Sequence, residues 1–198
     1  MSSNRNVSRR SFLTDLFRTG PTTAQRDHQT ASARRPRAFP LHRPPGAIAE
    51  SEFLEACTRC GDCTTACPHD AITAAAPRLR EAAGTPVIVA DVAPCRMCAD
   101  TPCFASCAAG ALREDATTRM ATATIEPWAC LAQQGSFCTV CHEQCPVPGA
   151  TRLEEGRPRI VADVCTGCGV CRFACPAPEN AILLQPLLER PTTVGDSR

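Results

Sequence analysis

Residues 57–68, CTRCGDCTTACP, decide the fold, because four cysteines follow the spacing C-x2-C-x2-C-x3-C and a proline comes next. The same spacing returns in residues 165–176, CTGCGVCRFACP. In such a run, three close thiolates bind three corners of a 4Fe-4S cluster from one loop. Structural zinc sites normally use two C-x-x-C pairs and need no third cysteine in the loop. The two complete runs therefore predict iron–sulfur clusters.

The other cysteines form two irregular groups between these runs, so that all 16 fall into four groups of four. Group two, CRMCADTPCFASC, has two extra residues before its third cysteine, and group three, CLAQQGSFCTVCHEQCP, has seven residues in its first interval. A longer loop still reaches a cluster, because the cost of loop closure grows slowly with length. We expect four 4Fe-4S clusters, with an empty or three-iron site as the alternative for groups two and three. The predicted ligands are Cys57, Cys60, Cys63 and Cys67 (group one), Cys95, Cys98, Cys103 and Cys107 (group two), Cys130, Cys138, Cys141 and Cys145 (group three), and Cys165, Cys168, Cys171 and Cys175 (group four).

An internal repeat relates the two halves of the chain. PVIVADVAPCRMC before group two matches PRIVADVCTGC before group four, and Cys95 and Cys165 are 70 residues apart. Such a period indicates a duplicated two-cluster unit. The β-branched stretches VIVADV and RIVADV predict strands at 87–92 and 159–164, and AILLQPLL after group four is expected to close a sheet. The predicted fold class is α+β, with two bacterial-type ferredoxin-like modules whose clusters hold together a small core.

The pairing of the four groups stays open at this point. In two-cluster ferredoxins the fourth cysteine of each run binds the neighbouring cluster. The duplication favours pairing group one with group two and group three with group four. The regular spacing of the outer groups favours pairing one with four and two with three.

Charge divides the chain into a basic arm and an acidic body. All 21 basic residues are arginines, and nine of them stand in residues 1–50 beside three acidic residues. The predicted organisation is a disordered arm at 1–50, a first module at 51–118, a second at 119–190 and a tail at 191–198. Within the arm, apolar residues at helical spacing predict a short amphipathic helix that ends at Gly20 and Pro21. Such a helix is expected to dock in a partner's groove or on the acidic body.

The arm also contains VSRRSFLTDLF at residues 7–17, which is close to a twin-arginine export signal. Export requires an apolar segment and a cleavage site after the arginines, and the residues that follow have neither. We therefore expect a cytoplasmic protein without a membrane span, in which cysteines bind metal more readily than they form disulfides. Clustered arginine attracts phosphate, but no groove-reading motif accompanies it, so no nucleic-acid partner is expected.

The ligand count limits the chemistry of this chain. A cluster bound by four cysteines has no open coordination position for a substrate, and no flavin or nucleotide motif is present. His69 and His142 lie close to the cysteine groups and are interpreted as surface residues. The sequence therefore predicts a protein that moves electrons or handles clusters, and not an enzyme.

Two stretches resemble the NapF family, ferredoxin-type proteins of the periplasmic nitrate reductase system. RPPGAIAESEFLEACTRCGDCTTAC, residues 43–67, is similar to that family's lead into its first cluster, and ACLAQQGSFCTVCHEQC, residues 129–145, is similar to its long third group. The linker at 21–42 is longer than in the family, and Gly46 replaces an aromatic residue. The resemblance implies a cytoplasmic accessory or maturation factor for the precursor of the nitrate reductase catalytic subunit, acting by cluster insertion or redox poising. The alternatives are a general electron-carrier polyferredoxin and an electron-transfer subunit of an oxidoreductase complex.

Overall fold

The computed structural model describes residues 40–190, in which short helices alternate with short strands. The amphipathic helix expected before Gly20, most of the basic arm, and the tail at 191–198 lie outside the described residues. The elements are α1 Glu50–Ala56, α2 Asp62–Ala66, β1 Ile72–Ala74, the 3-10 helix η2 Pro77–Ala82, β2 Pro86–Ile88, α3 Pro102–Ala105, β3 Ala121–Ile125, α4 Val140–Glu143, β4 Thr151–Glu154, β5 Arg157–Ile160, α5 Val170–Phe173 and β6 Ile182–Pro186. Among them, no helix is long and apolar enough to cross a membrane.

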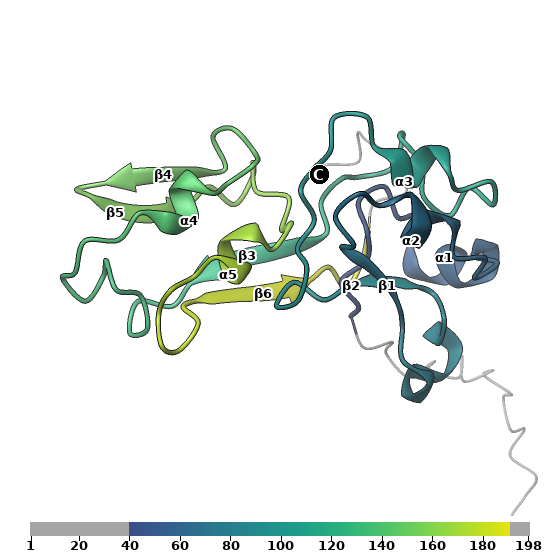
Figure 1. The fold of residues 1–198 in the computed structure, drawn as a ribbon, viewed down its shortest axis with the longest axis horizontal. Coiled ribbons are helices and arrows are strands. Elements are labelled where there is room, and N and C mark those ends of the chain that lie inside the picture. Colours follow the sequence, from purple (N-terminus) through teal and green to yellow (C-terminus); the bar gives the residue numbers. More distant parts are fainter. Residues whose placement is uncertain (1–39, 191–198) are drawn as a thin grey trace, which may run out of the picture. The chain divides into compact units, whose positions relative to one another are not determined.

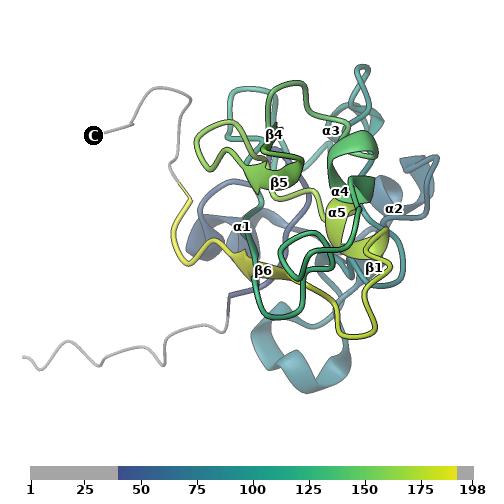
Figure 2. The ribbon, with the colours of Figure 1, turned by 90° about the vertical axis from the view of Figure 1, so that its left-hand side faces the viewer.

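The strands pair as antiparallel ladders of two, and the same arrangement occurs twice. An inner hairpin precedes group two (β1 with β2) and another precedes group four (β4 with β5). In the second module, which carries groups three and four, β3 and β6 form an outer pair beside α5 (Figure 1). Figure 2 shows α4 and α5 next to each other with the β4–β5 hairpin close by. The α+β class and its duplicated ferredoxin-like modules are thus confirmed.

The first module, which carries groups one and two, has only a remnant of the outer pair. A single antiparallel bridge joins Ala47 to Leu112 at that position. Pro44 and Pro45 precede Ala47, and proline has no N–H to donate to a ladder. Gly46 completes the local pairing, because its N–H donates to Thr117 O at 3.0 Å. The prolines therefore explain why the outer strand pair is lost in this module.

The two strands expected from the repeat are shorter than the β-branched stretches. β2 ends at Ile88 and β5 at Ile160, where the sequence predicts strands to 92 and 164. The shared Val-Ala-Asp-Val forms a turn in each copy, with Val92 N donating to Val89 O and Val164 N to Val161 O. This turn directs the chain from the hairpin into the cysteine loop, so the repeat encodes a strand followed by a turn.

The cores are small and contain cysteines. In the first module the fully buried Phe53 packs with Ile72, Phe104 and Leu112 among cysteines of groups one and two. In the second module Ile182 packs with cysteines of groups three and four. Because metal ligands form part of each core, cluster binding and folding are coupled.

A buried ion network joins the start of the described chain to its end. The Arg43 guanidinium is fully buried, stacks 4.5 Å from the Phe53 ring and donates to Thr85 Oγ1 at 2.7 Å. The Glu50 carboxylate accepts from Arg43 Nε at 3.1 Å and from Arg190 Nη1 at 3.0 Å. Arg190 Nη2 also donates to Leu41 O at 2.9 Å. One carboxylate therefore forms ion pairs with two buried guanidinium groups.

Replacing Glu50 with glutamine is expected to destabilise the fold strongly. The change leaves the side chains of Arg43 and Arg190, 0% and 2% exposed, without an anionic partner. Breaking a buried ion pair by removing one partner costs about 3–5 kcal/mol. The denaturant midpoint of the iron-loaded protein, followed by visible absorbance, measures the effect. Glu52→Gln, an exposed change in the same helical turn, is the matched control and should stay within about 0.5 kcal/mol of the parent; equal midpoints for both variants would contradict the argument.

Candidate iron–sulfur centres

The cysteine loops share a backbone turn that gathers the thiols. The residue before the second cysteine has a positive φ in three groups: 62° at Arg59, 54° at Met97 and 69° at Gly167. A helix of four or five residues begins after each loop and carries the third cysteine. Helices this short are unstable by themselves in water. Their positions therefore depend on the core and on the ligands that they present.

The thiols gather in four sets, and each set takes three cysteines from one group and one from its partner. The first site is Cys57, Cys60 and Cys63 with Cys107, and the second is Cys95, Cys98 and Cys103 with Cys67. The third site is Cys130, Cys138 and Cys141 with Cys175, and the fourth is Cys165, Cys168 and Cys171 with Cys145.

This arrangement resolves the pairing that the spacing leaves open. Group one exchanges its fourth cysteine with group two, and group three exchanges with group four. The exchange follows from the helices: α2 carries Cys63 of the first site and leads directly to Cys67 of the second. The duplication therefore predicts the pairing correctly, and the regular spacing of the outer groups does not.

The irregular loops reach their sites by turning back on themselves. In group two the two extra residues form a turn in which Thr101 N donates to Cys98 O, and Pro102 then starts α3. In group three the long interval folds over the first ligand, with Gln134 N donating to Cys130 O at 3.0 Å and Ser136 N to Leu131 O at 2.9 Å. Both loops thus place a complete set of thiols.

The donor sets fit 4Fe-4S clusters. All 16 cysteines are free thiols, and within residues 40–190 no three Cys, His, Asp or Glu side chains converge closely enough to bind a single metal ion. The thiols of the first three sites instead line cavities whose walls are mostly apolar. Four thiolates around a wider, apolar space match a cubane better than a zinc ion. When bound there, the clusters supply one-electron redox chemistry.

The electrostatics of these sites make deprotonation of the thiols depend on iron binding. Burial, and then the charges of Cys107, Cys57 and Cys60, raise the pKa of Cys63 to about 11. Burial, and then the neighbouring cysteines of the fourth site and Cys141, raise the pKa of Cys171 to about 12. Thiols with such pKa values stay protonated at neutral pH unless a cation displaces the proton. Iron binding must therefore release protons.

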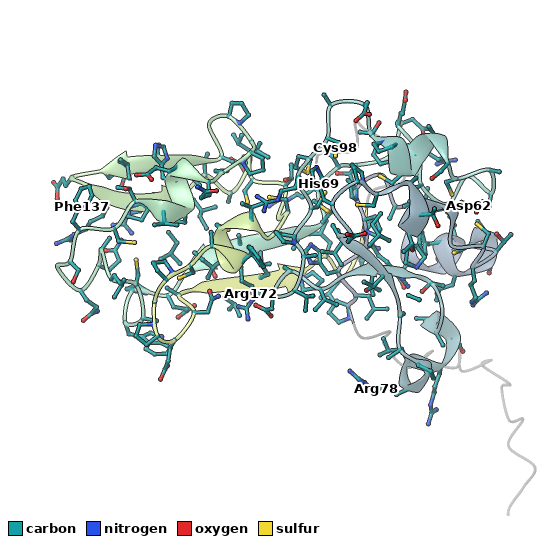
Figure 3. The ribbon with its side chains drawn as sticks, viewed as in Figure 1. Asp62, His69, Arg78, Cys98, Phe137 and Arg172 are labelled. Atoms are coloured by element: carbon teal, nitrogen blue, oxygen red, sulfur yellow. The ribbon has the colours of Figure 1, made fainter. Side chains whose placement is uncertain are left out.

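Backbone N–H groups point at ligand sulfurs. Leu112 N lies 3.4 Å from Cys107 Sγ, and Gly167 N lies 3.4 Å from Cys165 Sγ. Hydrogen bonds to cluster sulfurs are among the factors that set the reduction potential. In Figure 3, Cys98 and His69 lie near each other between the two modules, and both residues line the cavity of the second site. His142 bonds through Nδ1 to Thr151 Oγ1 at 3.0 Å.

One histidine near a cluster loop is missed by sequence reasoning. His42 Nε2 donates to Gly167 O, inside the fourth loop, at 3.0 Å. Burial, with the charge of Arg190, lowers the pKa of His42 to about 4 against the opposing effect of this hydrogen bond. His42 is thus neutral at physiological pH and fixes the loop without adding charge. Its position next to Arg43-Pro44 gave no signal, because the contact joins residues 125 positions apart.

Comparisons with known proteins agree with the four cysteine sets. Residues 53–73 and 156–177 each match a family described as a 4Fe-4S binding domain. The ferredoxin-type protein NapG of Escherichia coli is 39% identical over 90% of this chain and 86% of its own length. The methylamine utilization ferredoxin-type protein MauM of Methylorubrum extorquens is 40% identical over 73% of this chain and 72% of its own. No solved structure gives a significant match.

The fold and its four cysteine sets define a polyferredoxin, an electron-transfer protein with several 4Fe-4S centres. The chain belongs to the family of ferredoxin-type Nap and Mau proteins. The resemblance to the NapF family correctly indicates a ferredoxin-type protein of this family, but an assignment to NapF alone is too narrow. NapF of Escherichia coli is 29% identical over 68% of the chain, whereas NapG is more similar over a longer stretch.

Proposed function

We propose that this protein is an electron carrier that passes single electrons from a low-potential donor to an oxidoreductase of the nitrate reductase system. The observation that carries the proposal is the complete exchange of fourth cysteines. It gives every site four thiol ligands, so no coordination position is left for a substrate. Sites closed in this way suit electron transfer better than substrate chemistry.

The residues of the chain would serve this role by holding the centres beside apolar walls. The third-site cavity, for example, is lined by Ile125, Leu131 and Ile182 beside its cysteines. An apolar wall lowers the local dielectric, which together with N–H donors tunes the potential of a bound centre. A cluster bound at such a site would keep the same four thiolate ligands in both redox states, so little rearrangement would accompany each electron.

The family supports the choice of partner. The relatives named NapG and NapF share the Nap prefix of the family that the sequence resembles, which belongs to the periplasmic nitrate reductase system. The MauM relatives, named for methylamine utilization, support the same carrier role with a methylamine-oxidising system as the other partner class.

Anaerobic mixing tests the electron-carrier role. The iron-loaded protein is reduced with dithionite, freed from excess reductant and mixed with the oxidised nitrate reductase catalytic subunit and nitrate. We expect its visible absorbance to return to that of the oxidised form only when the subunit is present, because nitrate alone has no coordination position at these sites. Reoxidation at the same slow rate with and without the subunit would exclude it as the acceptor.

A finer proposal is maturation of the cytoplasmic precursor of that catalytic subunit, by cluster insertion or redox poising. It is supported by the long group-three loop, which resembles the NapF family, and by the similarity to NapF itself. A pull-down that compares precursor with mature subunit separates the roles. Preferential capture of the precursor, with iron moving from this chain to it, favours maturation. Equal capture with no iron transfer favours the carrier role.

We also propose that the protein works in the cytoplasm. The motif at residues 7–17 is followed by polar and charged residues in place of the apolar segment that export signals need. A reporter fused after Gly46 should therefore be active only in the cytoplasm. Reporter activity in the periplasm would overturn this localisation.

A further inference from the structure

The two modules touch at cluster ligands. Cys95 of the second site and Cys168 of the fourth site are joined directly, because Cys95 N donates to Cys168 O at 3.1 Å. Among the described contacts, this hydrogen bond links a ligand of one module to a ligand of the other.

Apolar side chains enclose this contact. Ile88, Met120 and Val170 are buried around Cys168, and Met97 packs against the same cluster. Met97 belongs to the group-two loop, and its sulfur accepts from Thr166 Oγ1 of the group-four loop at 3.6 Å. The junction is therefore largely apolar and is formed by the two loops themselves.

Two further contacts hold the junction in register. Arg172 makes a bidentate ion pair with Asp91, in which Nε donates to Oδ1 at 2.6 Å and Nη2 donates to Oδ2 at 3.2 Å. Gly169 lies against Ala90, so closely that a Cβ at Gly169 would be 2.5 Å from the Ala90 Cβ. Ala90 and Asp91 come just before group two, while Gly169 and Arg172 belong to group four. These contacts therefore fix the entry to the group-two loop against the group-four loop.

We propose that electrons cross between the modules through Cys95 and Cys168, so that the sites are ordered first, second, fourth, third. This inference rests on the carrier role proposed above and deepens it. The first and third sites are then the ends of the path and the points of exchange with partners. Figure 3 agrees, since Asp62 beside group one and Phe137 beside group three lie toward opposite ends, with Cys98 and Arg172 between them.

The order follows from the ligand sharing and the junction together. Within each module the exchanged fourth cysteines bring two sites next to each other, and the hydrogen bond between Cys95 and Cys168 makes the second and fourth sites the inner ones. One electron moves at a time: the centre that loses it is oxidised, the centre that gains it is reduced, and no bond to a ligand forms or breaks. Electron tunnelling weakens steeply with distance, so transfer proceeds between adjacent sites.

Spin coupling in variants that keep only two sites tests the order. Cys60→Ala with Cys138→Ala removes the end sites and keeps the second and fourth. We expect the dithionite-reduced protein to show magnetic splitting between the two remaining centres in its electron paramagnetic resonance spectrum. Cys98→Ala with Cys138→Ala keeps the first and fourth sites, and this splitting should be lost. Splitting in the second variant and none in the first would overturn the order.

A variant of the full chain covers the case in which two-site variants fail to load iron. Gly169→Ala forces its methyl group against Ala90 and should separate the loops, with loss of the coupling between modules while iron content and coupling within each module persist. Adding Ala90→Gly removes the opposing Cβ and should restore the coupling. Gly61→Ala is the matched control, because Gly61 has a similar φ of 86° and no neighbour within 4 Å of the added Cβ. Coupling that survives Gly169→Ala unchanged would exclude this junction.

These outcomes are separate from the test of the carrier role. Normal coupling in a protein that no acceptor reoxidises would contradict the proposed function and leave the order of sites standing. Rapid reoxidation of a protein that shows no coupling between the second and fourth sites would support the carrier role and contradict the order of sites.

Discussion

Replacing Cys107 with alanine is expected to empty the first site and to leave the second site, on Cys107's own group, filled. The reason is the exchange of fourth ligands, which places the Cys107 thiol with Cys57, Cys60 and Cys63. With four iron atoms per cubane, purified protein washed with a chelator should fall from about 16 iron atoms per chain to about 12. Total iron and protein analysis measures the change.

Double variants show which cysteines act together. Cys57→Ala with Cys107→Ala should lose no more iron than either change alone, because both thiols belong to the first site. Cys95→Ala with Cys107→Ala should lose about twice as much, about eight iron atoms, because two sites are then incomplete. The opposite pattern, with additive loss in the first pair and no added loss in the second, would mean that each group binds its own cluster.

Replacing Gly167 with alanine is expected to disrupt the second module. An added Cβ would lie 2.2 Å from Ala121 O and 2.6 Å from Ala121 C, and these are backbone atoms of β3 that cannot move aside. The φ of 69° adds strain for any residue with a side chain. Strained backbone and overpacking each cost roughly 1–3 kcal/mol. We expect a large fall in the denaturant midpoint and loss of iron from the fourth site.

Gly110→Ala is the control for this change. Gly110 has nearly the same φ, 67°, but nothing lies within 4 Å of its added Cβ. It should therefore show the backbone strain alone, about 1–2 kcal/mol. If both variants lost stability equally, the close approach of Ala121 would have no role in the requirement for glycine.

The sequence allowed the ligands and the duplication to be predicted because both are local patterns. Cysteine spacing reports which thiols share a loop, and the repeat before Cys95 and Cys165 reports a copied unit. The fourth ligand of each site depends on where a short helix directs the chain, and only the duplication argument pointed to it. The residue before the second cysteine is a second feature that the spacing does not explain. Arg59 and Met97 adopt a positive φ at this position although they have side chains. Glycine is required at 167 because β3 lies too close for a side chain, and the spacing does not reveal that strand.

The contacts between the modules could not be predicted from the sequence, for a different reason. The bond from Cys95 N to Cys168 O uses backbone groups that every non-proline residue has, so no side-chain pattern marks it. Arg43, Glu50 and Arg190 do carry distinctive charges, but their partners are as much as 140 positions apart. In both cases, long-range packing determines the contact and local composition does not.

The ion network around Glu50 also determines when the protein can finish folding as it is synthesised. Arg190 comes 140 residues after the carboxylate with which it pairs, so the network closes only after almost the whole described chain has left the ribosome. Until then Arg43 and Glu50 form a balanced pair, and the Leu41 carbonyl lacks its donor. A nascent chain stopped before Arg190 therefore has both cysteine modules but lacks the contacts from Arg190 to Glu50 and to Leu41. Synthesis of Arg190 is then the step that completes the contacts of Glu50 and Leu41.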